Sequence, residues 1–573
     1  MPTTLLCNHC HSELKFDDEP AILVTNENFR NMSIPSDTEL YHIQSLIEDA
    51  DRDLRHYDEE IERLSNTLAT LKTHRDDLQR SRDRYRAFSA PQRKLPMEIL
   101  GEIFSWCCSP SLLVDMHRES FAAPALVISQ TCSFWRKVAL TMPGLWSELK
   151  VHVVYEEPAA AITRLLEIYL LNSGSALLTL DFYGSPLDED DNGCEPDEDS
   201  CIWSILQALL NCGDRWMNCS FCFGWNLLSH ADKFLSQPTD YYYPNLKEFR
   251  LQSTLESSGH SSIISSIWPH APALLSLQVP TCNDGTLLFT SEDLQKLVIE
   301  SGMELSRIFR VFQTFPLLQE CGLQIGLEDD FDNDDDVDND MLSLPITHVN
   351  LRSLRCWFYQ IDDCANTFAS LTLPSLTTLD LTARYNGQQI SVLPSLEDLV
   401  RRSGCHLTTL KLNGQLVQSC NELLDIFAFT PSLMHLSLDV NRHFSLIDGD
   451  FFSRLTFPVD TWSEEITHIL LPQLKSCQLS FYTGRELDDN SSDRPSLPPP
   501  EDLLSMLTSR RAIFPGPYSK LQQIARFELS AYFLTPILGE KWTSAFSEVE
   551  PRLRLLEKEG LELSLEIVNL RKA

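Results

Sequence analysis

Apolar residues between Leu40 and Tyr85 recur in alternating steps of four and three residues. The seam they form consists of Leu40, Ile43, Ile47, Ala50, Leu54, Tyr57, Ile61, Leu64, Leu68, Leu71, Leu78 and Tyr85. Only Arg75 and Arg82 interrupt it, and the segment contains no Pro or Gly. A period of 3.5 residues kept over roughly six heptads predicts a coiled coil over residues 40–88. We expect it to form a parallel homodimer; the alternative is a helix that folds back on the rest of the chain.

A different pattern follows Pro91. The segment KLPMEILGEIFSWC has apolar residues spaced for one face of a short helix, and ALVISQTCSFWRKVAL gives a second helical pattern that Pro143-Gly144 ends. A loop is expected between them, around Ser109 to Pro124. Residues 91–150 are therefore predicted to form a small all-α unit.

From residue 151 to residue 573 one phrase recurs, a turn followed by Leu-x-x-Leu-x-Leu. Its leading leucines are Leu246, Leu274, Leu294, Leu318, Leu351, Leu376, Leu407, Leu433 and Leu474. Several copies follow a helical stretch, so each unit supplies one strand and one helix, and neither can bury its apolar face alone. Stacked units solve this problem. We expect a degenerate α/β leucine-rich-repeat array, a solenoid, over residues 151–573.

The net charge of the chain limits the kinds of partner that it can bind. The chain has 46 Lys and Arg against 82 Asp and Glu, a formal charge of −36. Such a field repels nucleic-acid phosphates and anionic lipid. Two acidic tracts, near residues 187–200 and 328–340, are expected to be solvated loops, and the second lacks the Gly and Glu that complete an EF-hand. We expect neither a nucleic acid nor a membrane as partner.

Candidate chemistry is sparse. The sequence contains no GxGxxG, GxxxxGK[ST], GxSxG or HExxH motif, so we expect no enzyme, no cofactor and no catalytic residue. Cys7 and Cys10 form half of a zinc site within residues 1–39, which are expected to be mostly a disordered tail. Whether they bind zinc stays open, and no metal site is assigned. Seventeen scattered Cys and no apolar run of about 18 residues predict a soluble protein of the cytoplasm or nucleus.

Two stretches of the small helical unit resemble a known module. LPMEIL, and TCSFWRKVAL followed by MPGLW, are similar to the opening and the close of an F-box. The F-box is the adaptor-binding module of ubiquitin-ligase substrate receptors. The resemblance implies that Leu95, Pro96, Ile99 and Leu100 contact the Skp adaptor, and that Trp135 and Trp146 pack inside the module.

The order of the segments extends the resemblance. A heptad helix, this form of F-box and a long degenerate leucine-rich array look like the large F-box protein families of mushroom-forming fungi. That likeness implies a non-catalytic substrate receptor of a Skp-cullin-F-box ubiquitin ligase, with a cullin-RING ligase behind the adaptor. The alternative is a non-catalytic protein-interaction scaffold without a ligase role.

The repeat pattern also selects candidates for target binding. In a Leu-x-x-Leu-x-Leu strand the leucines point inward and the residues between them point to the opposite face. Six such positions are expected to bind a target protein: Arg250, Arg355, Trp357, Asp380, Lys411 and His435. The acidity of this part of the chain suggests a basic target, drawn in by long-range attraction.

Overall fold

A computed structural model describes most of the chain. The described residues are 3–5, 13–15, 30, 34–116, 118–154, 160–185, 201–223, 242–253, 270–280, 293–326, 345–358, 361–383, 391–414, 416–417, 419–441, 447, 449–457, 469–483, 499–512, 521–533 and 536–569. Both acidic tracts, and Cys7 and Cys10, lie outside them. The chain divides into two compact units, residues 1–99 and 100–573.

The first unit contains one long helix. α2 covers Asp37–Phe88, and none of its residues is buried. It begins after Ser36, whose backbone N–H donates to Glu39 Oε2 at 2.9 Å, so a free donor of the first turn is satisfied. Within the expected tail, β1 (Thr3–Leu5) pairs antiparallel with β2 (Glu13–Lys15). The predicted N-terminal helix is confirmed.

A short helical segment follows. The 3-10 helix η1 (Pro91–Lys94) precedes α3 (Met97–Cys107), and the boundary between the two units falls inside α3. α4 (Pro124–Thr131), α5 (Ser133–Leu140) and the 3-10 helix η2 (Pro143–Trp146) complete it. Between α3 and α4 the chain forms β3 (Leu112–Asp115) and β4 (Ser120–Ala122), an antiparallel pair. The expectation of a loop around Ser109 to Pro124 is therefore wrong, because this stretch contains a hairpin. Residues 91–150 are accordingly not all-α.

One sheet of 16 strands dominates the second unit, and from β5 onward its strands follow chain order. After β3 and β4 come β5 (Glu148–Val154), β6 (Leu178–Ser185), β7 (Trp216–Phe223), β8 (Glu248–Ser253), β9 (Ser276–Val279), β10 (Lys296–Met303), β11 (Glu320–Ile325), β13 (Ser353–Phe358), β15 (Thr378–Ala383), β16 (Thr409–Asn413), β17 (His435–Asn441), β18 (Ser476–Thr483), β19 (Arg526–Phe533) and β20 (Glu562–Asn569). Neighbouring strands pair in parallel, apart from β3 with β4. β12 (Ile346–Thr347) and β14 (Leu371–Thr372) form a separate parallel pair.

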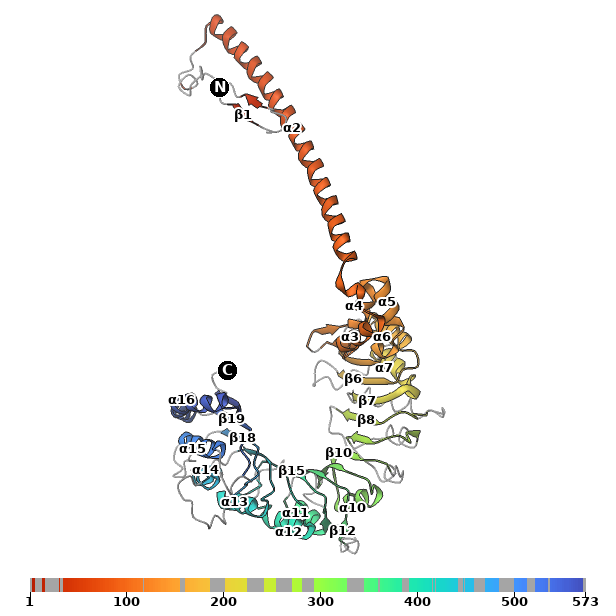
Figure 1. Ribbon diagram of the computed structural model, residues 1–573, viewed down its shortest axis with the longest axis vertical. Helices are drawn as coiled ribbons and strands as arrows, with labels where there is room; N and C mark the ends of the chain where they lie inside the picture. Colours follow the sequence, from red (N-terminus) through yellow and green to blue (C-terminus); the bar gives the residue numbers. More distant parts are fainter. Residues whose placement is uncertain are drawn as a thin grey trace. The chain divides into compact units, whose positions relative to one another are not determined.

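Helices connect many of these strands. They are α6 (Ala160–Asn172), α7 (Cys201–Leu210), the 3-10 helix η3 (Gly213–Arg215), α10 (Leu305–Thr314), α11 (Ile361–Ser370), α12 (Leu393–Ser403), α13 (Cys420–Phe429), α14 (Gly449–Leu455), α15 (Pro500–Arg511) and α16 (Pro536–Lys558). Figure 1 shows α10 to α16 along one side of the strands. The fold is mixed α/β with a large, mostly parallel sheet.

The core of the second unit lies between the sheet and its helices. All nine leading leucines of the recurring phrase are at most 1% exposed, and every copy of the phrase forms a strand of the sheet. The expected boundary at residue 150 falls within β5, which pairs with β3 on one side and β6 on the other. Strand pairing therefore joins the segment of α3–α5 to the repeated part.

Polar side chains at the C-terminal ends of two helices make hydrogen bonds to the backbone of the preceding strand-to-strand connection. Arg402 donates to Leu371 O at 2.7 Å, and Ser403 Oγ accepts from Leu373 N at 2.9 Å. Further along the chain, Arg510 donates to Leu455 O at 2.7 Å and Ser509 Oγ accepts from Phe457 N at 3.0 Å. In each case an Arg-Ser pair ties the C-terminal end of a helix to the backbone that follows the preceding helix.

Candidate interaction surfaces

Helix α3 is apolar on two opposite faces. One face is buried through Leu100, Gly101 and Phe104, and the Phe104 ring lies 5.0 Å from that of Trp135. Gly101 allows a close approach, because a Cβ there would lie 2.9 Å from Met142 Sδ. This face anchors the helix in the protein.

The other face of α3 is exposed. Ile99, Ile103 and Trp106 are 48%, 42% and 86% exposed, and steps of four and three residues place them in one row along the helix. We call these three residues the α3 stripe. Exposed apolar side chains gathered in one row are typical of a protein-interaction site.

The four residues expected to contact an adaptor fall on both sides of this division. Pro96 and Ile99 are exposed and Leu95 is half-buried, whereas Leu100 is only 1% exposed. The side chain of Leu100 therefore packs in the core and is not available to a partner. Ile103 and Trp106 were missed as site residues, although the spacing from Ile99 could have identified them.

The two tryptophans of the module differ in burial. Trp146 is 1% exposed, and its indole N–H donates to Ala139 O at 2.9 Å. Its ring also meets Tyr169 of α6 edge-on at 5.0 Å. Trp135 is half-buried against Phe104. Trp146 thus packs inside as expected, and Trp135 does so in part.

The six residues expected to bind a target all lie on the sheet face opposite the buried leucines. Pairing across β13, β15 and β16 places Arg355, Asp380 and Lys411 side by side. His435 belongs to the neighbouring row, where it pairs with Thr409. Arg250 is four strands from Arg355 in the same row, roughly 19 Å at 4.8 Å per strand. The structure places Arg355, Trp357, Asp380 and Lys411 on three adjacent strands and His435 on the next strand, and it leaves Arg250 four strands from Arg355.

Trp357 lies against a small notch in the sheet. A Cβ on Gly322 of the neighbouring strand would lie 3.4 Å from Trp357 Cη2 and 3.2 Å from a methyl of Val298. Only glycine leaves this room, so the ring rests close to the backbone of β11. The Arg355 guanidinium lies 5.8 Å from the ring centroid, and its Nε donates to Asp380 Oδ2 at 3.1 Å. Trp357 is therefore half-buried and held from two sides.

An unsatisfied polar group adjoins this tryptophan. Gln324 pairs with Trp357 across β11 and β13, and its side chain is 4% exposed. Its Oε1 has no hydrogen-bond partner within the described part of the chain. A buried acceptor without a donor costs free energy, so Gln324 locally weakens the sheet beside Trp357.

A second polar cluster joins strands β3, β5 and β6. His152 Nδ1 lies 3.5 Å from Asp115 Oδ2, and its Nε2 lies 3.6 Å from Asp181 Oδ2. The Asp181 carboxylate, with help from Asp115, raises the pKa of His152, although burial opposes this shift. Sequence analysis missed this cluster, because only the strand pairing brings the three residues together.

Carboxylates without a cationic partner among the described residues lie further along the same face. Asp439 of β17 is half-buried, and burial raises its pKa. Glu300 accepts hydrogen bonds from Gln278 Nε2 at 2.7 Å and Gln252 Nε2 at 3.4 Å. These acceptors make the open face of the sheet suited to donors and cations.

The described residues contain no group of three or more His, Cys, Asp or Glu that could hold a metal ion. Among them, no helix has both the length and the apolar character that crossing a membrane requires. No protein-family model matches the chain, and no curated protein matches it. The two candidate surfaces rest on the exposed side chains of the α3 stripe and of the open face of the sheet.

Proposed function

We propose that the chain is a non-catalytic substrate receptor of a Skp-cullin-F-box ubiquitin ligase. In this proposal Leu95, Pro96 and the α3 stripe bind the Skp adaptor, and the open face of the sheet binds a target protein. The main observation behind this proposal is the α3 stripe. Ile99, Ile103 and Trp106 are large and exposed, and they form one row that begins within the LPMEIL sequence. Burying such side chains against an adaptor gives a favourable free energy.

The repeated part supports the receptor role. Its strands carry the leucine-rich phrase, bury the leading leucines and pair in chain order, as expected of a leucine-rich-repeat solenoid. A solenoid offers an extended surface made of many strands, and here that surface is polar, with an aromatic residue at Trp357. A basic segment fits it best, because Asp439 and Glu300 place carboxylates without a cationic partner among the described residues on this face.

The alternative is a scaffold with the same surfaces and no ligase role. A scaffold predicts that the open face binds a partner and that the stripe does not bind the Skp adaptor.

Co-purification with the Skp adaptor distinguishes the two. We expect the full chain to retain the adaptor and the Ile99→Lys/Ile103→Lys variant to lose it. Loss of a central apolar anchor often costs about 2 kcal/mol or more, which is roughly a thirtyfold loss of affinity per residue. The matched control is Ile168→Lys/Leu171→Lys on α6, where the side chains are 42% and 80% exposed. Equal retention by both variants would contradict the proposed adaptor site.

A further inference from the structure

Helix α2 has an apolar seam along its whole length, and the seam is exposed. Among its large members, Ile47, Leu54, Ile61, Leu71 and Leu78 are 54%, 59%, 64%, 61% and 73% exposed. A 52-residue helix with no buried residue gains little from packing within its own chain. The exposed apolar seam is therefore suited to packing against another helix.

Charges on the two sides of the seam differ between the halves of the helix. In the first half the flanking positions carry Asp37, Asp51, Asp53, Asp58 and Glu60. In the second half the flanking positions carry Lys72, His74 and Arg86, and the seam itself contains Arg75 and Arg82. The helix is therefore acidic in its first half and basic in its second half along the contact face.

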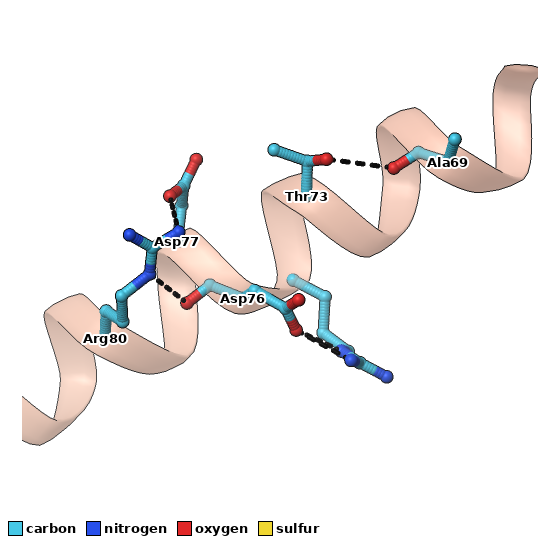
Figure 2. A network of polar contacts seen from close by, with 6 residues as sticks. Ala69, Thr73, Asp76, Asp77 and Arg80 are labelled. Atoms are coloured by element: carbon cyan, nitrogen blue, oxygen red, sulfur yellow. Dashed lines mark hydrogen bonds and ion pairs between the residues drawn. The ribbon is translucent and has the colours of Figure 1, made fainter.

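Some charges on the outer face are satisfied within the helix. Figure 2 shows Arg80 contacting Asp77 and the backbone of Asp76, with Thr73 bonded to Ala69. Arg80 Nη2 lies 2.8 Å from Asp77 Oδ1. By contrast, Asp51, Asp53, Lys72 and His74 make no ion pair with any described residue. These four groups without ionic partners lie beside the seam.

We propose that α2 pairs with α2 of a second copy of this chain, in antiparallel orientation. In the proposed alignment, the numbers of two facing residues add up to 125. The first heptad position is the one of Leu40, and the fourth is the one of Ile43. Each seam layer then pairs the first position of one copy with the fourth position of the other, as is normal in antiparallel coiled coils. The layers are Leu40 with Tyr85, Ile43 with Arg82, Ile47 with Leu78, Ala50 with Arg75, Leu54 with Leu71, Tyr57 with Leu68, and Ile61 with Leu64.

This alignment also matches the flanking charges. It places Asp51 beside Lys72 and Asp53 beside His74 of the second copy, and Asp37 beside Arg86. Twofold symmetry makes each pair occur twice. Arg75 faces the small Ala50, which leaves room for its long side chain beside Asp51 and Asp53. Arg75 thus meets the acidic half of the partner helix, whereas Arg82 faces Ile43. Within its own helix, Arg75 pairs with Asp76 and Arg82 pairs with Asp83.

A parallel pair lacks these matches. In parallel register, Asp53 of one copy lies beside Asp58 of the other, and like charges at this position oppose pairing. Lys72 then faces Thr67, and Arg75 and Arg82 each face their own counterpart across the seam. Charge thus favours the antiparallel order over the parallel one that the heptad pattern by itself suggested.

Charge reversal tests the orientation with the full-length chain. Sedimentation equilibrium is expected to give twice the chain mass of 65.4 kDa for the wild type. Asp51→Lys/Asp53→Lys should raise the dimer dissociation constant at least tenfold, and adding Lys72→Asp/His74→Asp should restore it. Glu48→Lys/Glu59→Lys is the matched control on the outer face, and it changes the net charge equally. In a parallel dimer, Asp53→Lys would instead strengthen association.

Cysteine cross-linking gives an independent readout. Mixed Leu54→Cys and Leu71→Cys chains should form a disulfide between copies, whereas Leu54→Cys alone should not. In the antiparallel pair the two copies of residue 54 lie roughly 25 Å apart along the axis, at 1.5 Å per residue. The wild-type chain controls for its native cysteines. A monomer at tens of micromolar, or a disulfide that joins two Leu54→Cys chains through position 54, overturns the proposal.

Discussion

Arg510 gives the most direct test of how the repeated part is held together. Its side chain is 1% exposed and donates to Leu455 O at 2.7 Å, Leu471 O at 2.9 Å and Leu470 O at 2.8 Å. The guanidinium lies 4.4 Å from the ring centroid of Phe457, and burial lowers its pKa to about 10. Replacing Arg510 with Met removes the charge and the three donors but keeps most of the side-chain volume.

Two opposing effects set the magnitude. Each carbonyl left without a donor in a buried place costs about 1–3 kcal/mol. Removal of the buried cation recovers part of this cost, because the charge no longer has to be desolvated. We therefore expect Arg510→Met to lower the free energy of unfolding by about 2–4 kcal/mol. Arg401→Met is the matched control, since the Arg401 side chain is 74% exposed and pairs with the exposed Asp398.

The assay combines urea unfolding with hydrogen exchange. In a stack of repeats each unit contacts only its neighbours, so the loss should be local. Amides of α14, β18 and α15 should exchange faster in Arg510→Met, while those of β5 to β7 keep their wild-type protection. The reasoning is refuted if Arg510→Met and Arg401→Met unfold at the same urea concentration with the same exchange pattern.

Three further predictions concern the candidate surfaces. Leu100→Ala should lower the free energy of unfolding by about 2–5 kcal/mol, whereas Ile99→Ala should leave it nearly unchanged in thermal denaturation, because only Leu100 is in the core. Gly322→Ala should destabilise the protein, and Val298→Ala should offset part of that loss in a double-mutant cycle, because the new Cβ lies 3.2 Å from a Val298 methyl. The raised pKa of His152 means that its pairing with Asp181 and Asp115 stabilises the fold below about pH 6.5 and loses this effect as pH rises through the folded-state pKa. Urea midpoints measured from pH 5 to 9 should therefore fall with rising pH more for the wild type than for His152→Gln, and parallel curves would contradict this.

The strands of the repeated part could be predicted where leucines occupy the Leu-x-x-Leu-x-Leu positions. β5 and β19 were not predicted, because other residues occupy some of the leucine positions of that phrase. In β5 the buried residues are Leu149, Val151 and Val153. In β19 the inward positions include Phe527, Ala531 and Phe533. Buried residues alternate with half-buried ones along β5, whereas in β19 Leu529, Ser530 and Ala531 are buried in succession. A search for the period of two would therefore have found β5 more readily than β19.

The candidate site shows where a local pattern is insufficient. LPMEIL predicts a helix start, but α3 is apolar on both faces, so the sequence does not tell which face packs inward. Leu100 was therefore grouped with Ile99, although successive residues lie about 100° apart on a helix and only Leu100 faces the core. The hairpin of β3 and β4 joins the sheet through the distant strand β5, and no local pattern reveals such a contact.

Strand pairing also bears on how the proposed receptor would work. β3 joins β5, so the segment that carries Ile103 and Trp106 belongs to the same compact unit as Trp357 and Asp439. In the proposed receptor, a target held on the sheet and an adaptor held at Ile103 and Trp106 would be linked through one compact unit. Such a link raises the effective concentration of the target near the ligase only when the two sites have compatible geometry.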